Sequence, residues 1–284
     1  MLFFDDKPGL IHLKPEPIAL VRRQMIRRLG LAFALVCLVG GLLLLLLSSA
    51  ESIAGHKLPD FSAYTDVSEK KEAFFEFLAP MIQAENARIL EIREEILTLQ
   101  QRVSDGKALR KSQIRRLREL GEEYAFKDLE TIDARFIDYL LQRVDVVPVS
   151  LALAQAAYES GWGSSRFARQ GNNLYGIWCY TPGCGIVPTQ RSPGMTHEVA
   201  SYGSVEECIR AYIHNLNTGN AYRSVRGIRN DLRVHGEPLQ GMPLARGLER
   251  YSGIGWDYVL EMQDMIRANR LERYDLYSVS VKKR

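Results

Sequence analysis

Residues 148–163, PVSLALAQAAYESGWG, decide the fold. Proline is favoured in the first turn of a helix, so Pro148 marks where a helix begins, and the glycines at 161 and 163 mark where it ends. Nearly every position between them is apolar, and a helix that is apolar all round is buried. Its last turn nevertheless holds one carboxylate, Glu159. The stretch therefore predicts a buried central helix with an acidic group at its carboxyl end.

Glu159 is the first candidate for chemistry. It lies beside Tyr158 and near Trp162 at the end of a buried helix, so we expect its carboxyl group to be partly desolvated. Desolvation raises the pKa of a carboxyl group, as a general acid at neutral pH requires. Glycosidases use a carboxylic acid in such an aromatic-lined site to protonate a leaving oxygen. Position alone leaves a second interpretation open, in which Glu159 points to solvent at a helix end.

The sequence around this helix predicts an α+β domain. Residues 131–144 are amphipathic and predict a helix that precedes it. In residues 176–202, seven glycines and prolines break up short β-branched and aromatic stretches, a pattern typical of hairpins. Further helices are predicted at 204–217, which starts with a capping-box pattern, and at 220–233, 243–251 and 256–269. The fold class is α+β, with a mainly helical domain over residues 130–275 and a small antiparallel β lobe.

The N-terminal part of the chain predicts a membrane anchor. Residues 29–47, LGLAFALVCLVGGLLLLLL, hold no charge, and a helix of this length spans about 28 Å, close to the hydrocarbon thickness of a bilayer. Four arginines lie between residues 22 and 28, so the positive-inside rule places residues 1–28 in the cytoplasm. We predict a single transmembrane helix at 29–49 in the inner membrane, with the C-terminal domain in the periplasm. A signal peptide cleaved near residues 48–50 is the alternative.

The charge distribution agrees with this topology. The net charge of +3 comes from 37 Lys and Arg against 34 Asp and Glu. Residues 1–28 hold six of the basic and three of the acidic residues, and residues 51–284 hold 31 of each. A balanced exported domain argues against nucleic-acid binding. The sequence also lacks GxSxG and HExxH patterns, so we predict no serine or metal hydrolase, no metal and no cofactor.

Export affects how the four cysteines are interpreted. Cys179 and Cys184 flank a Pro-Gly turn, and in an oxidising periplasm this pair predicts a disulfide that closes a tight loop. A zinc site is not favoured, because no second Cys/His pair with ligand spacing accompanies them. Cys208 is predicted to be a buried helix residue, and Cys37 a small apolar residue of the membrane stretch.

Between the anchor and the domain, the sequence predicts a linker and a helical membrane-proximal region. Residues 50–65 have no periodic pattern, and residues 66–129 are mostly helical, with a break or kink near Pro80. Packing against the rest of the chain is the favoured role of these helices. An envelope protein partner that binds residues 66–126 is the alternative. Residues 276–284 form a C-terminal tail.

Two motifs resemble a known family. Residues 154–163, AQAAYESGWG, followed by GNNLYG at 171–176, resemble the signature of bacterial glucosaminidase domains, glycoside hydrolase family 73. With the Cys179/Cys184 loop and Thr196-His197-Glu198-Val199, the sequence is most similar to the bacterial Bax proteins. The resemblance covers residues 130–275. It implies a lysozyme-like α+β fold and cleavage of the β-1,4 bond after N-acetylglucosamine in peptidoglycan, with Glu159 as the catalytic acid.

The resemblance also implies a second carboxylate in the β lobe, which would act as a base for water. Glu198 is the only acidic residue between Glu159 and Glu206, so it is the predicted base. A surface strand residue is the alternative. A lobe that holds Glu198 far from Glu159 suits an inverting reaction with water between them. Otherwise the N-acetyl group of the substrate acts as nucleophile.

Aromatic and amide side chains complete the predicted site. Tyr251 to Tyr258, YSGIGWDY, resembles the family's YATDPxY stretch but lacks its TDP and is one residue longer between the tyrosines. We assign the catalytic-site tyrosine to Tyr251. Flat sugar faces pack on aromatic rings, so exposed aromatic side chains are candidates for substrate binding. The alternative for an aromatic residue is core packing, and for an asparagine it is turn formation. The predicted substrate-binding residues are Trp162, Asn173, Tyr175, Trp178, Tyr202 and Tyr258.

Two other functions remain open at this stage. A lytic transglycosylase also uses one glutamate in an ES motif on a lysozyme-like fold, but NLYGI stands here in place of its GLMQ-like segment. A non-catalytic wall-binding or scaffolding protein would retain the groove without the chemistry. The intact motif around Glu159 favours an enzyme.

Overall fold

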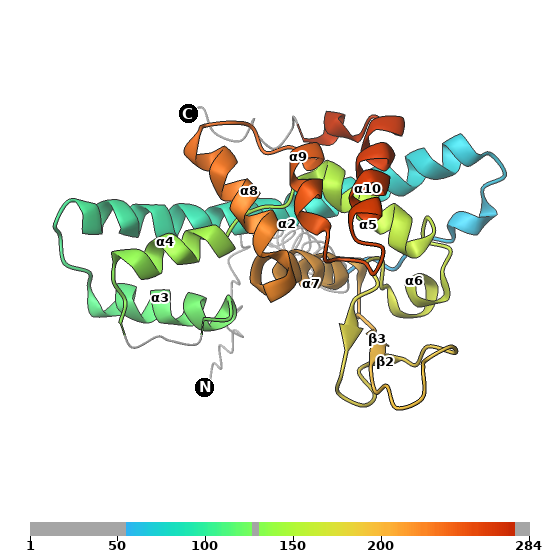
Figure 1. The fold of residues 1–284 in the computed structure, drawn as a ribbon, viewed down its shortest axis with the longest axis horizontal. Helices are drawn as coiled ribbons and strands as arrows, with labels where there is room; N and C mark the ends of the chain where they lie inside the picture. Colours follow the sequence, from blue (N-terminus) through green and yellow to red (C-terminus); the bar gives the residue numbers. More distant parts are fainter. Residues whose placement is uncertain (1–54, 127–130, 276–284) are drawn as a thin grey trace, which may run out of the picture. The chain divides into compact units, whose positions relative to one another are not determined.

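The computed structural model describes residues 55–126 and 131–275 (Figure 1). The predicted cytoplasmic segment 1–28, the transmembrane helix 29–49 and the tail 276–284 lie outside these residues. Within the described ranges, no helix has both the length and the hydrophobicity needed to cross a membrane.

The longest element is α2, Val67–Ser104. Asp66 caps it by accepting hydrogen bonds from the amides of the second and third helical residues. The helix continues through Pro80, so a break, one of the two predicted forms, is wrong, and a kink, the other, stays a prediction. Pro80 and Glu76 lie on the exposed side of the helix, where water can bond the carbonyl that the proline leaves unpaired. Helices α3, Lys111–Glu123, and α4, Ala134–Arg143, pack near the C-terminal half of α2 (Figure 1).

Helix α5, Val149–Ser160, is the buried central helix that the sequence predicts. It ends at Gly161, which adopts the left-handed conformation with φ of 56°. One neighbour approaches it very closely: a Cβ on Gly241 would lie 2.1 Å from the hydroxyl of Ser150, so only glycine fits there. The elements packed around α5 are α2, α9 (Gly241–Ala245), α10 (Trp256–Ala268) and η4 (Leu271–Tyr274).

Helices α7, α8 and α10 lie close to the predicted ranges, whereas α6 and the short helix η1 were not predicted. Helix α7, Val205–Thr218, begins after Ser204, whose hydroxyl accepts a hydrogen bond from the amide of Glu207. It buries Cys208 completely, as predicted. The other elements are η1 (Phe61–Ala63), α6 (Arg166–Gly171), η2 (Asn220–Tyr222), α8 (Arg223–Val234) and η3 (Arg246–Leu248).

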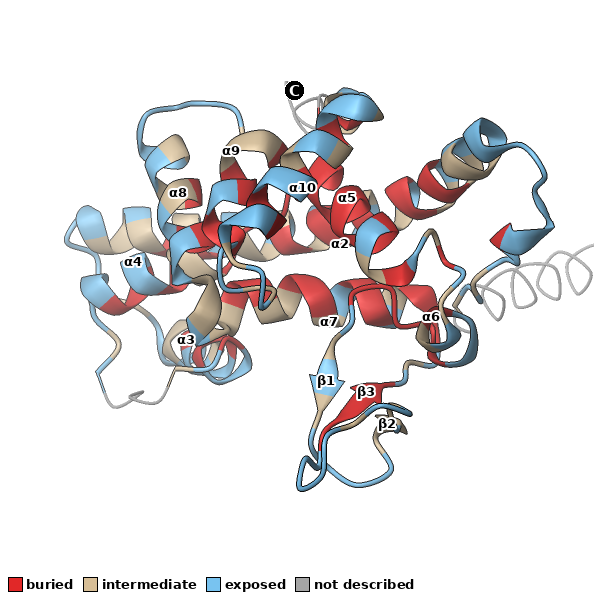
Figure 2. Ribbon diagram, turned by 45° about the vertical axis from the view of Figure 1, so that its right-hand side comes forward, coloured by how far each residue is buried: buried red, intermediate tan, exposed pale blue. Residues whose placement is uncertain are grey.

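The β lobe is a small antiparallel sheet in the order β1-β3-β2. The strands are β1 (Trp178–Cys179), β2 (Gly185–Ile186) and β3 (Glu198–Ala200). The central strand β3 is buried, as Figure 2 shows. The prediction of a mainly helical α+β domain with a small antiparallel lobe is therefore confirmed.

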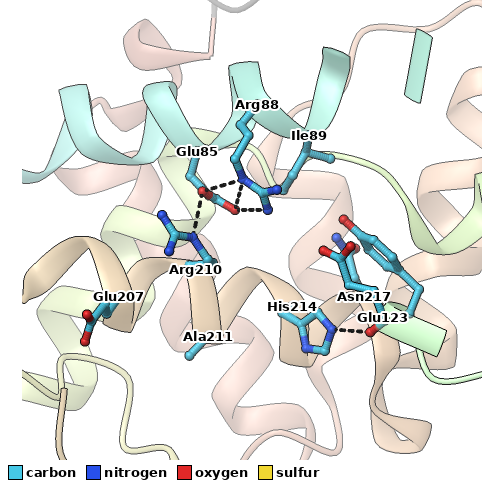
Figure 3. Close-up of a pocket in the computed structure, with 10 residues that line it drawn as sticks. Glu85, Arg88, Ile89, Glu123, Glu207, Arg210, Ala211, His214 and Asn217 are labelled. Carbon is cyan, nitrogen blue, oxygen red and sulfur yellow. Dashed lines mark hydrogen bonds and ion pairs between the residues drawn. The ribbon is translucent and has the colours of Figure 1, made fainter. Parts of the chain in front are cut away.

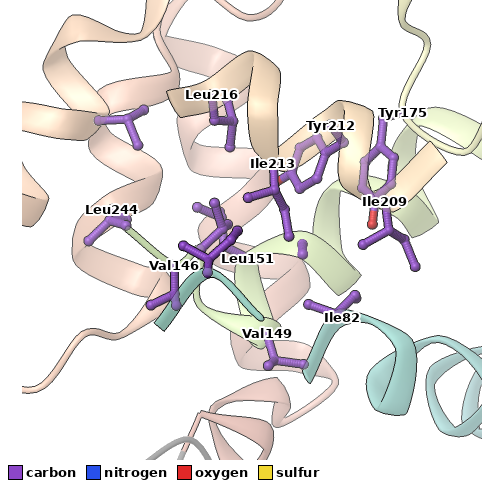
Figure 4. Close-up of a cluster of buried hydrophobic side chains, with 14 of the residues drawn as sticks. Ile82, Val146, Val149, Leu151, Tyr175, Ile209, Tyr212, Ile213, Leu216 and Leu244 are labelled. Carbon is purple, nitrogen blue, oxygen red and sulfur yellow. The ribbon is translucent and has the colours of Figure 1, made fainter. Parts of the chain in front are cut away.

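One hydrophobic core joins α2 to the rest of the domain. Ile82 of α2 lies near Val149 of α5 and Ile209 of α7 in the cluster shown in Figure 4. The chain before α2 is also attached to the domain: His56 donates from its amide to Glu206 at 2.9 Å and accepts at its carbonyl from the amide of Val205 at 2.9 Å. Residues 55–60, part of the predicted linker, have no regular structure but are docked on the start of α7.

Candidate active site

Glu159 lies in the last turn of α5, half-buried. Its carboxylate Oε1 accepts a hydrogen bond of 2.7 Å from the hydroxyl of Tyr258. Burial raises the pKa of Glu159 above the ordinary value of a glutamic acid, and the hydrogen bond from Tyr258 partly opposes this by stabilising the carboxylate. A partly desolvated carboxyl group with a raised pKa can act as a general acid.

Tyr258 is held by α10, whose third residue it is, and it is fully buried. Its hydroxyl accepts a hydrogen bond of 3.0 Å from Nε2 of Gln155, one helical turn before Glu159 on α5. The Oε1 of Gln155 accepts in turn from the hydroxyl of Tyr212 on α7, at 2.6 Å. Three helices thus meet at one hydrogen-bonded group of side chains that ends at Glu159.

The turn after α6 lies against the other carboxylate oxygen. Gly176 has φ of +64°, and a Cβ built on it would lie 3.3 Å from Oε2 of Glu159. Asn173 shapes this turn, because its Oδ1 accepts from the amides of residues 175 and 177 and its Nδ2 donates to the carbonyls of Ile177 and Ala200. In this structure the side chain of Asn173 is fully engaged with the main chain, as the turn-forming alternative describes.

Tyr251 stands beside this group without touching Glu159. Its ring stacks on that of Tyr258, with centroids 5.4 Å apart and planes 7° from parallel. Its hydroxyl donates to the carbonyl of Tyr175 at 2.8 Å. The tyrosine in contact with the carboxylate is therefore Tyr258, where the sequence suggested Tyr251. This sequence has one residue more between its two tyrosines than the family's motif, so the sequence alone does not decide between Tyr251 and Tyr258.

Glu198 lies in β3, where it is buried. Its Oε1 accepts from the amide of Gly183 at 3.0 Å and its Oε2 from the amide of Gly185 at 2.8 Å. These two donors lower the pKa of Glu198, so the group is a carboxylate at neutral pH. In the described part of the chain, no hydrogen bond joins it to Glu159.

The turn that binds Glu198 is closed by the predicted disulfide. Cys179 and Cys184 are bonded, with their Cα atoms 6.3 Å apart, which confirms this prediction. The two sulfurs and a carboxylate oxygen of Glu198 lie within 4.8 Å of one another. Because the sulfurs are joined to each other, they offer no thiolate to a metal ion.

The predicted sugar-binding rings occupy different environments. Trp162 packs against α2: its ring centroid lies 5.8 Å from that of Phe74 and 5.3 Å from that of Phe75. Tyr175 is 1% exposed and lies in the core, as the packing alternative describes, so its side chain offers no surface to a sugar in this structure. Trp178 is 52% exposed and stacks on His197 at 3.9 Å, and Tyr202 is half-buried. Among these four rings, Trp178 is the most exposed in this structure.

A hollow of about 250 Å³ lies elsewhere, between α2, the end of α3 and α7 (Figure 3). Three of its charged side chains pair with one another. Glu85 accepts from Arg88 at 2.7 Å and from Arg210 at 3.4 Å. The lining includes none of the predicted site residues, so this hollow is separate from the Glu159 site.

Sequence reasoning missed Gln155 and Tyr212. A signal for Gln155 was present, since residues four apart share one helix face and Gln155 precedes Glu159 by four. A glutamine in an otherwise apolar buried helix also needs partners for its amide. Tyr212 gave no such signal, because its position follows from how α7 packs on α5.

Comparison with known proteins identifies the class. Residues 134–270 match the glucosaminidase family, described as mannosyl-glycoprotein endo-beta-N-acetylglucosaminidase. The chain is 32% identical over 210 residues to Protein bax of Escherichia coli (strain K12), which covers 74% of this chain and 73% of that protein. The chain therefore belongs to the Bax-like glucosaminidase family, a family of glycosidases, as the motifs indicated.

A solved structure is also similar. The crystal structure of the catalytic domain of the autolysin Auto from Listeria monocytogenes aligns with a TM-score of 0.40 and 16% identity. The alignment covers 80% of this chain and 95% of that chain.

Proposed function

We propose that the protein is a peptidoglycan hydrolase that cleaves the β-1,4 glycosidic bond after N-acetylglucosamine, with Glu159 as general acid. The proposal is supported by membership of the glucosaminidase family. The observation that carries it is the Glu159 carboxyl group, which is half-buried, has a raised pKa and lies at the end of the motif helix α5.

In the proposed reaction, the protonated carboxyl of Glu159 gives its proton to the glycosidic oxygen as the bond from C1 to that oxygen breaks. The oxygen of a water molecule bonds to C1. One proton of this water passes to a base, and the other stays on the new hydroxyl group. Glu198 is our candidate for this base, since its two amide donors keep it ionised. If Glu198 instead serves only to hold the turn, the N-acetyl group of the substrate, in place of water, would be the nucleophile that attacks C1.

We further propose that residues 29–49 anchor the protein in the inner membrane and that the described domain lies in the periplasm. Glycan strands of peptidoglycan are found in that compartment. The uncharged stretch and the arginines before it support this topology.

The test is the release of muropeptides from purified sacculi by the full chain in detergent. We expect wild type to release fragments with reducing N-acetylglucosamine ends and Glu159→Gln to release almost none. Glu261→Gln, an exposed glutamate of α10, is the matched control and should act like wild type. Equal release by Glu159→Gln would refute the role of Glu159. A 1,6-anhydromuramic product would show a lytic transglycosylase, and no release by wild type would favour the non-catalytic alternative.

A further inference from the structure

Three helices contribute to a chain of hydrogen bonds that ends at Glu159. Tyr212 Oη lies 2.6 Å from Gln155 Oε1, Gln155 Nε2 lies 3.0 Å from Tyr258 Oη, and Tyr258 Oη lies 2.7 Å from Glu159 Oε1. Gln155, Tyr212 and Tyr258 are each fully buried, so no water competes for the two bonds that join them.

The chemistry of the groups gives this chain one direction. An amide nitrogen only donates and an amide oxygen only accepts. Tyr258 therefore receives a hydrogen bond from Gln155, and its single O–H is left to donate to Glu159. The Gln155 amide is oriented with its oxygen toward Tyr212, whose hydroxyl donates to it, and with its nitrogen toward Tyr258.

Tyr212 is itself firmly placed. Its ring stacks on that of Tyr175, with centroids 3.8 Å apart and planes 7° from parallel, and the two rings lie side by side in Figure 4. The hydroxyl of Tyr175, in contrast, has no hydrogen-bond partner among the described residues. Of the two stacked tyrosines, only Tyr212 therefore contributes its hydroxyl to the chain of hydrogen bonds.

We propose that Gln155 and Tyr212 are positioning residues, which set the direction of the chain so that Tyr258 donates to Oε1 of Glu159 and Oε2 is left to carry the transferable proton. Oε2 is the oxygen beside Gly176, where a Cβ would lie 3.3 Å from it. This inference rests on the proposed role of Glu159 as general acid.

The Tyr258 hydroxyl is the side-chain donor that stabilises the charged form of Glu159. The titratable side chains that face it are Tyr212 of α7, Tyr222 of η2, Tyr251 in the turn before α10 and Tyr258 of α10. Burial raises the pKa of each tyrosine, so all are neutral in the working range. Tyr258 supplies the hydrogen bond that stabilises the Glu159 carboxylate. Losing this bond would raise the pKa of Glu159. Since a general acid must be protonated, the alkaline limb of the pH–activity profile would move to higher pH.

The decisive variant is Tyr212→Phe, which removes one hydroxyl two hydrogen bonds away from Glu159. The amide of Gln155 is then free to turn, so that its oxygen faces Tyr258 and the Tyr258 hydroxyl donates to Gln155. We expect the alkaline limb to move up by about one pH unit, the effect of losing one hydrogen bond to a charged group. Tyr258→Phe removes the donor directly and should shift the limb at least as far.

The matched control is Tyr175→Phe, which removes the unpartnered hydroxyl from the other ring of the stack. Its alkaline limb should stay at the wild-type position. The full chain is used throughout, and the melting temperature of each variant is measured. If Tyr212→Phe does not fold, Gln155→Met takes its place: it removes the amide oxygen that could compete for the Tyr258 hydroxyl, so Tyr258 should still donate to Glu159 and the limb should stay at the wild-type position. A limb as high as that of Tyr258→Phe in this variant would overturn the inference.

A double variant tests whether Tyr212 acts through Tyr258. Tyr212→Phe with Tyr258→Phe should shift the limb no further than Tyr258→Phe alone. A wild-type limb in folded Tyr212→Phe, the same shift in Tyr175→Phe, or additive shifts in the double variant would each overturn the inference. None of these results touches the proposed function, which fails only if Glu159→Gln stays active or wild type releases nothing.

Discussion

The contact between α2 and the motif helix can be tested by Phe74→Ala. Phe74 is completely buried and lies among three aromatic rings, with centroid distances of 5.2 Å to Phe61, 6.0 Å to Phe75 and 5.8 Å to Trp162. The neighbouring backbone is also close, since a Cβ on Gly163 would lie 3.4 Å from the ring. Removing the ring would leave a cavity between α2 and the end of α5.

The expected loss follows from this packing. Replacing a buried phenylalanine by alanine costs about 3–5 kcal/mol, a large part of the roughly 5–15 kcal/mol that stabilises a typical domain. The control is Val67→Ala at the start of the same helix, which is 65% exposed and should change the free energy of unfolding by no more than about 0.5 kcal/mol.

The assay is urea unfolding of the full chain in detergent, followed by far-UV circular dichroism. With a slope of about 2–3 kcal/mol per molar urea, Phe74→Ala should lower the midpoint by about 1–2 M. A midpoint no lower than that of Val67→Ala would show that α2 does not belong to the core. Loss of only part of the helical signal at low urea would show that α2 unfolds separately.

Three further predictions concern the acid, a buried ion cluster and a tight helix contact. Activity of wild type should fall as pH rises through the raised pKa of Glu159, and a pH–activity profile whose limb lies at about 4.3, the value of a free glutamic acid, would contradict this. Asp145 is 2% exposed and three arginine side chains lie 2.8 to 3.9 Å away; Asp145→Asn should cost about 3–5 kcal/mol in urea unfolding. Its pKa is lowered, so its contribution should be present at neutral pH and disappear as pH falls through that pKa. Gly241→Ala should lower the melting temperature, costing about 1–3 kcal/mol because its Cβ would meet Ser150, whereas Gly227→Ala in α8, with open space around it, should raise stability by about 0.5–1 kcal/mol.

The parts of the fold that the sequence predicts are those set by local signals. Pro148 and Gly161 bound α5 as expected, and the Pro-Gly turn between Cys179 and Cys184 brings the two sulfurs together. The apolar composition of α5 also predicts its burial. These features depend on neighbours in the chain, so a single sequence contains the information for them.

Contacts between distant elements escaped prediction for a physical reason. Tyr258 reaches Glu159 across 99 residues, and that contact depends on how α10 packs on α5. Trp162 was predicted to be a sugar-binding ring, but its ring packs against Phe74 and Phe75 of α2. Periodicity shows that α2 has an apolar face and does not show what covers that face.

The main-chain donors that hold Glu198 affect how the β lobe can vary in sequence. Both of its carboxylate oxygens accept from backbone amides, which every residue except proline supplies. The first donor, Gly183, has open space around its Cα, although its φ of +81° favours glycine or asparagine. The second, Gly185, is fixed, because a Cβ there would lie 2.0 Å from the carbonyl oxygen of Val199. Most side chains of this turn can therefore change without removing the two main-chain amides that bind the carboxylate of Glu198.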